Sequence, residues 1–124
     1  MAATPHILII EDEERIRATM QLALETEGYS VATAADGPEG LGRFREDGPW
    51  NVVLLDQRMP GMDGTEVLRR LKQVDPAVRI IVVTAYGSVE LASKALGTGA
   101  SAFLLKPINP DQLRKTVRDV LEWK

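Results

Sequence analysis

The stretch Ile7-Leu8-Ile9-Ile10-Glu11-Asp12-Glu13-Glu14 places four branched apolar residues directly before four acids. An apolar run of this kind, without polar alternation, is typical of a strand that is buried on both faces. In open parallel sheets, ligands bind just outside the carboxyl ends of such strands. This stretch therefore indicates an α/β fold with an acidic site at one edge of its sheet.

Further apolar runs along the chain alternate with segments of helical periodicity. The runs are Tyr29–Ala34, which is the weakest, Val52–Leu55, Ile80–Val83 and Ala102–Leu105. Regular alternation of strands and helices predicts a parallel sheet with helices on both faces. We therefore expect a strand followed by a helix, repeated five times in one domain over residues 1–124, with a core of about 6–122.

Capping residues mark the ends of the expected helices. Gly28 is placed to end the first, and Asp36 with Glu39 resembles a capping pair for the second, which carries Gly40 and Gly42. Thr65, Ser88 and Asn109 are the predicted caps of the other three. The expected inward positions are Ile16, Met20, Ala23 and Leu24, then Leu41 and Phe44, then Val67, Leu68, Leu71 and Val74, then Val89, Ala92 and Leu96, and finally Leu113, Val117, Val120 and Leu121.

Composition excludes several classes of protein. The 124 residues carry 15 basic and 18 acidic side chains, a net charge of −3 that argues against a strongly basic nucleic-acid binder. There is no cysteine and one histidine, His6, so a disulfide framework, a thiol nucleophile and a multi-histidine metal site are excluded. The apolar runs are too short to span a membrane and no secretory signal is visible. We expect a cytoplasmic protein with no direct contact to nucleic acid or membrane.

Chemically reactive residues follow the expected strands. Glu11 and Asp12 come after the first, Asp56 after the third, Thr84 after the fourth and Lys106 after the fifth. If the first and third strands are neighbours, three carboxylates converge, and their mutual repulsion calls for a cation. Mg²⁺ suits such oxygen ligands, and three carboxylates, one Mg²⁺ and Lys106 sum to zero charge. The alternative is that Glu11 and Asp12 only favour the N-terminus of the first helix, as we expect for Glu13 and Glu14.

Asp56 is the candidate nucleophile of this cluster. A carboxylate beside Mg²⁺ can attack a phosphoryl group and become an aspartyl phosphate. Lys106 can pair with the phosphoryl oxygens, and the Thr84 hydroxyl can donate a hydrogen bond to them. The residues that follow Asp56, from Gln57 to Gly64, are rich in turn formers and predict a loop.

Five separated segments together resemble the receiver domain of two-component response regulators. They are Ile7-Leu8-Ile9-Ile10-Glu11-Asp12-Glu13, Leu54-Leu55-Asp56, Met59-Pro60-Gly61-Met62-Asp63-Gly64, Val83-Thr84-Ala85 and Phe103-Leu104-Leu105-Lys106-Pro107. The match covers about residues 6–122. The loops after Asp56 and Thr84 resemble most closely the receivers of the nitrogen-regulation class, which commonly precede an ATPase and a DNA-binding module. The resemblance implies a flavodoxin-like fold with five parallel strands in the order 2-1-3-4-5.

The resemblance also implies a role for each site residue. Asp56 is the phosphoacceptor, assisted by Lys106 and Thr84. Asp12 and Asp56 bind Mg²⁺ directly, Glu11 acts through water and the backbone carbonyl of Arg58 supplies another ligand. Two further sets complete the expected site: the switch pair Thr84 and Phe103, and the cis peptide bond Lys106–Pro107. Arg58 and Tyr86 lie two residues past Asp56 and Thr84 and are expected to tune dephosphorylation. In this sequence Glu11 replaces the commoner Asp, and Phe103 stands where Tyr is also common.

The expected function is a phosphorylation switch. A sensor histidine kinase or phosphotransfer protein supplies the phosphoryl group, and the chain catalyses only its own phosphorylation and dephosphorylation. Phosphorylation is expected to reshape the surface formed by the helix after Ser88, the strand Ala102–Leu105 and the helix after Asn109. The resemblance implies that this surface controls an output domain beyond the C-terminus or a separate partner, which is expected to be transcriptional, or that it forms a homodimer.

Three other interpretations use the same residues differently. A Mg²⁺-dependent phosphatase or dehalogenase-like enzyme would require a second Asp two residues after the nucleophile, where Arg58 stands. A nucleotide binder could use Gly97-Thr98-Gly99-Ala100-Ser101-Ala102, but that motif precedes an expected strand, whereas a nucleotide motif follows one. A degenerate receiver would act only as an interaction module, against which the complete set of acids, Thr84 and Lys106 argues.

Overall fold

The computed structural model describes residues 4–57, 62, 64–85, 97 and 99–122. Within these residues a five-stranded sheet has the order β2-β1-β3-β4-β5, and all of its strand pairs are parallel. The strands are β1 (His6–Ile10), β2 (Ser30–Ala34), β3 (Val52–Asp56), β4 (Ile80–Thr84) and β5 (Ala102–Leu105). The described helices are α1 (Glu14–Thr26), α2 (Gly37–Asp47), α3 (Gly64–Val74) and α5 (Pro110–Leu121). The predicted flavodoxin-like fold and its strand order are therefore confirmed.

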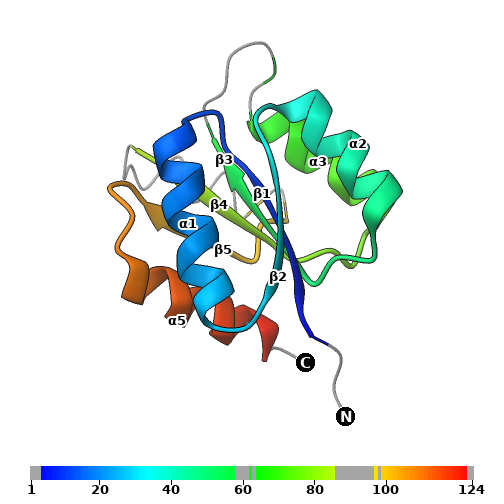
Figure 1. Cartoon of the computed structure of the whole chain (residues 1–124). Coiled ribbons are helices and arrows are strands. Elements are labelled where there is room, and N and C mark those ends of the chain that lie inside the picture. Colours follow the sequence, from blue (N-terminus) through cyan, green and yellow to red (C-terminus); the bar gives the residue numbers. More distant parts are fainter. Residues whose placement is uncertain (1–3, 58–61, 63, 86–96, 98, 123–124) are drawn as a thin grey trace.

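The helices cover both faces of the sheet (Figure 1), because alternate residues of the apolar strands point to opposite sides. On one face, Leu8, Ile10, Val53 and Leu55 pack with residues of α2 and α3. On the other, Ile7, Ile9, Val52 and Leu54 pack with residues of α1 and α5. The central strands β1 and β3 are almost completely buried, as their uninterrupted apolar runs predicted.

The predicted caps have mixed outcomes. Asp36 accepts a hydrogen bond from the Glu39 amide at 2.8 Å, Asn109 caps α5 through the amides of Asp111 and Gln112, and Gly28 follows α1 with φ of 92°. The prediction for Thr65 is wrong, because α3 already begins at Gly64. The hydroxyl of Thr65 instead accepts a hydrogen bond from Gln57.

One predicted core position is not buried, and one predicted helix lies outside the described residues. Val74 was expected to face the core but is 43% exposed, and it is the last residue of α3. The other three inward positions of α3 are buried. The helix predicted after Ser88 lies outside the described residues.

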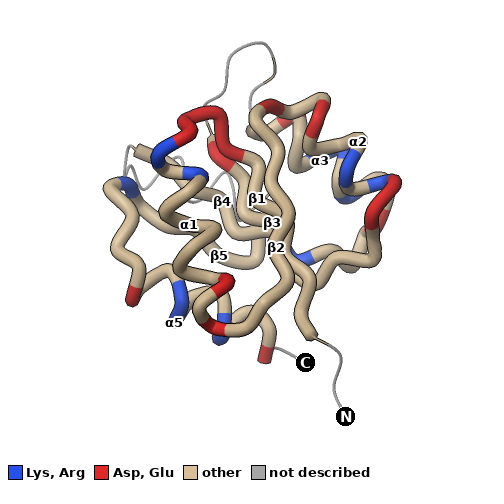
Figure 2. The backbone as a smooth tube through the Cα atoms, in the orientation of Figure 1, with Lys and Arg blue, Asp and Glu red and all other residues tan. Residues whose placement is uncertain are grey.

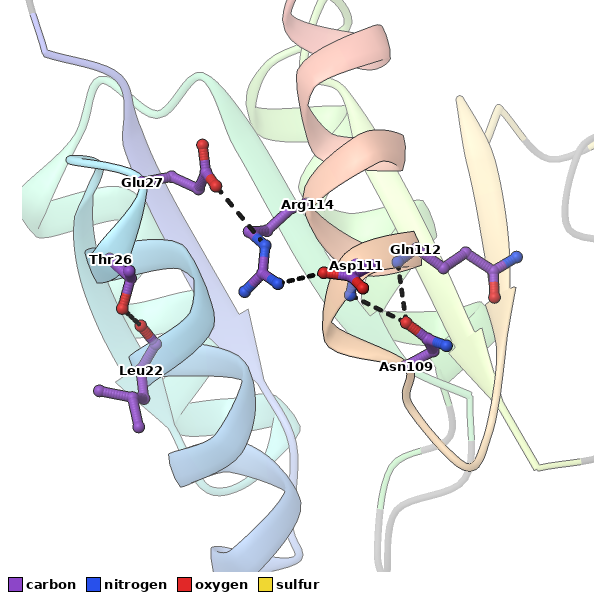
Figure 3. Close-up of polar contacts among 7 residues, drawn as sticks. All are labelled: Leu22, Thr26, Glu27, Asn109, Asp111, Gln112 and Arg114. Carbon is purple, nitrogen blue, oxygen red and sulfur yellow. Dashed lines mark hydrogen bonds and ion pairs between the residues drawn. The ribbon is translucent and has the colours of Figure 1, made fainter.

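Polar contacts join α1 to α5 on their shared face of the sheet (Figure 3). Arg114 of α5 pairs with Asp111 in its own first turn and with Glu27 just past the end of α1, with a distance of 3.5 Å between Arg114 Nε and Glu27 Oε1. Leu22 of α1 is 69% exposed, and its side chain points away from α5 (Figure 3). The buried residues of the two helices meet beneath these contacts, so the seam is mainly apolar inside and polar outside.

Two glycines of α2 provide a matched pair for testing how closely this helix packs. A Cβ at Gly40 would lie 2.4 Å from Cδ1 of the fully buried Ile10, whereas a Cβ at Gly42 would have no atom within 4 Å. We expect Gly40→Ala to lower the free energy of unfolding by ~1–3 kcal/mol through overpacking. Gly42→Ala should raise it by ~0.5–1 kcal/mol, because alanine favours the helix. Urea unfolding measures both changes, and equal effects of the two substitutions would contradict the packing described.

Candidate phosphoacceptor and metal site

The site lies at the carboxyl ends of β1 and β3, which are adjacent in the sheet. Ile10 pairs with Leu55 in the register, so Glu11, which directly follows β1, lies level with Asp56, the last residue of β3. Figure 2 shows the acidic residues after β1 gathered with the end of β3 at this edge of the molecule. The parallel arrangement thus places side chains close together that are 45 positions apart in the chain, as the sequence predicted.

Three carboxylates and one ammonium group meet at this edge. Glu11, Asp12 and Asp56 each offer an oxygen within 4.8 Å of the others. The ammonium of Lys106 lies 2.9 Å from Glu11 Oε1 and 3.3 Å from Asp56 Oδ1. Glu11 and Asp56 are 1% and 3% exposed, while Asp12 is partly exposed. The cluster carries two more negative charges than Lys106 can balance when all its carboxyls are ionised.

Burial and the neighbouring charges together shift the pKa values of these residues. Burial, reinforced by the neighbouring Glu11, raises the pKa of Asp56 to about 8. Burial opposes ionisation of Asp12 as well, but hydrogen bonds with Glu11 and Asp56 hold its pKa below the usual value. Burial likewise disfavours the charged form of Lys106, yet its hydrogen bond to Glu11 and its attraction to Asp56 keep its pKa above the usual value. In the metal-free protein Asp56 therefore holds its proton more tightly than an ordinary aspartate does.

The backbone around Asp56 is fixed from two sides. The Gln57 amide donates to the Val83 carbonyl of β4 at 2.8 Å, and the Gly64 amide donates to the Gln57 carbonyl at 3.0 Å. A Cβ at Gly64 would lie only 2.7 Å from the Asp56 carbonyl oxygen. Only glycine allows the start of α3 to approach the end of β3 so closely.

The candidate switch residues occupy β4 and β5. Thr84 ends β4 and is 5% exposed, and its carbonyl accepts a hydrogen bond from the Lys106 amide at 2.8 Å. Phe103 is partly buried and packs against the α2–α3 side of the core. The Lys106–Pro107 peptide bond is cis. Thr84 and Lys106 thus lie on adjacent strands, with Lys106 directed at the acidic cluster.

Some predicted residues are not described by the structure. Arg58 and Tyr86, together with the expected helix after Ser88, lie outside the described residues. The nucleotide-binding interpretation of residues 97–102 is not supported by the fold, because this segment leads into β5 and does not open a helix after a strand.

One side chain that the sequence analysis did not consider contacts the site's backbone. Arg17 of α1 donates from Nη1 to the carbonyl oxygen of Glu11 at 2.8 Å. The only sequence signal was a basic residue six positions after the first acid, which is too common to single out.

The donor set fits a magnesium ion. Mg²⁺ prefers oxygen ligands and is usually bound by one or two carboxylates with waters and phosphate oxygens. Carboxylates are the only side chains in this three-residue group, and their excess negative charge over Lys106 equals the charge of a divalent cation. The partly exposed Asp12 leaves the cluster open to solvent on one side.

Comparisons with known proteins identify the same family that the sequence motifs resemble. The sequence matches the family described as the response regulator receiver domain over residues 7–118. It is 36% identical to sporulation initiation phosphotransferase F of Bacillus subtilis over 118 residues, covering 95% of this chain and 94% of that protein. A receiver domain of the CheY-like type from Methanospirillum hungatei superposes with a TM-score of 0.89 at 36% identity, covering 97% of this chain and 95% of that one. The chain therefore belongs to the response regulator receiver domain family.

Other relatives are longer proteins that carry this domain as one part. The chain is 43% identical over 116 residues to the uncharacterized transcriptional regulatory protein YkoG of Bacillus subtilis, covering 94% of this chain and 50% of that protein. The transcriptional regulatory proteins ZraR and GlrR of Escherichia coli match as well, and this chain spans about a quarter of their length. These matches support the resemblance to the nitrogen-regulation class.

Members of this family are phosphorylation-dependent signalling switches and not conventional enzymes. They bind Mg²⁺ at an acidic pocket and interact with histidine kinases or phosphotransfer proteins. In the described part of this chain, no helix is long and apolar enough to span a membrane.

Proposed function

We propose that this chain accepts a phosphoryl group on Asp56 from a phosphohistidine of a sensor histidine kinase or phosphotransfer protein, and later releases it by hydrolysis. One observation carries the proposal: a carboxyl that is 3% exposed lies beside a lysine and two further acids, with the three acids close enough together to hold one cation. Placing three acids this close together is costly without a cation, which favours a metal-dependent site over a purely structural role.

Asp12 and Asp56 are the residues proposed to hold Mg²⁺ directly, with Glu11 acting through water and the Arg58 carbonyl as a further ligand. When bound, Mg²⁺ supplies positive charge that favours the ionised carboxylates and the oxygens of an incoming phosphoryl group. The raised pKa of Asp56 makes this contribution necessary, because a protonated carboxyl is a poor nucleophile at neutral pH.

The chain's own residues account for the transfer itself. An oxygen of the ionised Asp56 forms the new bond to phosphorus as the bond from phosphorus to the donor imidazole nitrogen breaks, and the imidazole keeps the electron pair. Lys106 is already held at the cluster by Glu11, so its ammonium can pair with the transferred oxygens without a large movement. The Thr84 hydroxyl is proposed to donate to the same group from the end of β4.

The bound phosphoryl group is proposed to shift the protein between two states. It carries roughly two negative charges, which draw Thr84 inward and let Phe103 enter the space that Thr84 leaves. The surface around β5, α5 and the helix expected after Ser88 would then change. It would control an output domain or partner, which the names of the longer relatives suggest is transcriptional, or it would form a homodimer. Arg58 and Tyr86 are proposed to tune the lifetime of the phosphorylated state, and an unchanged lifetime in Arg58→Ala would contradict that role.

Uptake of phosphate from a small acyl phosphate, followed by intact mass, tests the proposal. The wild-type protein should gain one phosphoryl group in the presence of Mg²⁺ and none after chelation of the metal. Asp56→Asn should gain no phosphoryl group. Its matched control Asp75→Asn, in the turn after α3, should behave like the wild type. Uptake without Mg²⁺, or no uptake under any condition, would overturn the proposed mechanism.

A further inference from the structure

We infer that Arg17 is a positioning residue for the proposed magnesium site, on which this inference rests. Its guanidinium donates a charge-assisted hydrogen bond of 2.8 Å to the carbonyl oxygen of Glu11. That carbonyl belongs to the peptide group that joins Glu11 to Asp12, two members of the acidic cluster. Arg17 therefore contacts the backbone between the acids and not a metal-ligating oxygen.

The planarity of the peptide group explains how one bond can orient both acids. Because carbonyl and amide share a plane, fixing the direction of the Glu11 carbonyl also fixes the amide of Asp12. The backbone and side-chain torsions of the two residues then set where each carboxylate points. Arg17 thus limits the turn that carries the chain from β1 into α1.

The other polar groups of Glu11 are held as well. Its amide donates to the Ala34 carbonyl of β2 at 3.0 Å. Its carboxylate pairs with Lys106 and accepts a hydrogen bond from the Glu13 amide at 3.2 Å. With Arg17 on the carbonyl, both backbone groups of Glu11 and its Oε2 make hydrogen bonds, while the buried Oε1 forms an ion pair with Lys106. The backbone of Glu11 is therefore held in place before a cation arrives. Removing a group that orients metal ligands in this indirect way typically lowers the affinity for the metal by ~10–100-fold.

Simple electrostatics makes the opposite prediction, which gives the inference a sharp test. Removing a positive charge near a cation site reduces repulsion and should tighten cation binding. If Arg17 positions the acids, its loss should instead weaken binding. Arg15, an exposed arginine on the same turn of α1, supplies the matched control for charge alone.

The experiment is a calorimetric titration of MgCl₂ into the unphosphorylated full chain, well below its unfolding temperature. Arg17→Met should raise the Kd for Mg²⁺ by about tenfold, while Arg15→Met should leave it unchanged or lower it. Arg17→Gln, which keeps a polar surface but is too short to reach the Glu11 carbonyl, should reproduce the loss if the Met variant folds poorly. Saturating Mg²⁺ should restore phosphoryl uptake in both Arg17 variants.

Wild-type affinity in Arg17→Met or Arg17→Gln would overturn the role of Arg17, as would an equal loss in Arg15→Met. Failure of saturating Mg²⁺ to restore uptake would also count against a positioning role. Failure of the wild type itself to bind Mg²⁺ would overturn the proposed metal site together with this inference, so the two failures are distinguishable.

Discussion

Asp56→Asn is expected to stabilise the metal-free protein by ~1–3 kcal/mol at pH 8, although it should abolish phosphoryl uptake. The fold holds this carboxyl almost completely buried beside Glu11, which raises its pKa from 3.8 to about 8. Ionising it in the folded protein costs free energy, since one pKa unit corresponds to about 1.4 kcal/mol. Asparagine has nearly the same shape and no charge to bury.

The pH dependence of this effect has a defined sign. The folded protein binds the Asp56 proton more tightly than the unfolded chain does, so this group contributes its full stabilisation below pH 3.8. That contribution is lost as the pH rises toward about 8. The difference between Asp56→Asn and wild type should therefore be small near pH 4 and grow up to pH 8.

Urea unfolding at a series of pH values, with a chelator present, measures the difference. Addition of Mg²⁺ at pH 8 should stabilise the wild type and have a much smaller effect on Asp56→Asn, which has lost one ligand. A destabilising effect of Asp56→Asn at pH 8 in the absence of metal would contradict this expectation. It would show that neighbouring groups stabilise the ionised Asp56 carboxylate in the folded protein.

Lys106→Met should have the opposite effect and lower the free energy of unfolding by ~3 kcal/mol at pH 8 without metal. Lys106 lies 2.9 Å from Glu11 Oε1 and 3.3 Å from Asp56 Oδ1, and its side chain is only 11% exposed. Removing one partner of a buried ion pair leaves uncompensated charge, which typically costs 3–5 kcal/mol. Methionine keeps most of the volume, so the loss reports charge and not a cavity.

Lys115→Met is the matched control on α5. Lys115 pairs with Asp119, but both side chains are more than half exposed, and such pairs contribute ~0–1 kcal/mol. Its substitution should change stability little, and urea unfolding of both variants measures the contrast. Equal losses in the two variants would mean that the contacts of Lys106 with the acidic cluster contribute no more than a surface pair.

Much of this fold could be predicted from the sequence, because buried parallel strands leave an unmistakable pattern. The run before Glu11 and the run before Asp56 predicted the two central strands directly. The predictions failed where tertiary contacts decide the start of a helix or the burial of a residue. Thr65 is a good capping residue by type, yet α3 begins at Gly64, two residues before a helix capped by Thr65 would begin, where it closely approaches the Asp56 carbonyl. Val74 has the right spacing for the core but lies at the end of its helix.

The candidate site was predictable for the same reason that the fold was. In a parallel sheet the ends of neighbouring strands converge, so Glu11, Asp56 and Lys106 meet although they are far apart in the chain. The direct pairing of Glu11 with Lys106 could not be predicted, because it depends on side-chain conformation. The contact of Arg17 with a backbone carbonyl also leaves no trace in a residue pattern.

The central claim, that Asp56 is the phosphoacceptor, is tested most directly by locating the modified residue. Reduction of the acyl phosphate with borohydride converts a phosphorylated aspartate to homoserine, which peptide mass spectrometry can assign to one position. After incubation with a small acyl phosphate and Mg²⁺, the account predicts homoserine at position 56 in the wild type and at no position in Asp56→Asn. Homoserine at another position, or undiminished labelling of Asp56→Asn, would contradict it.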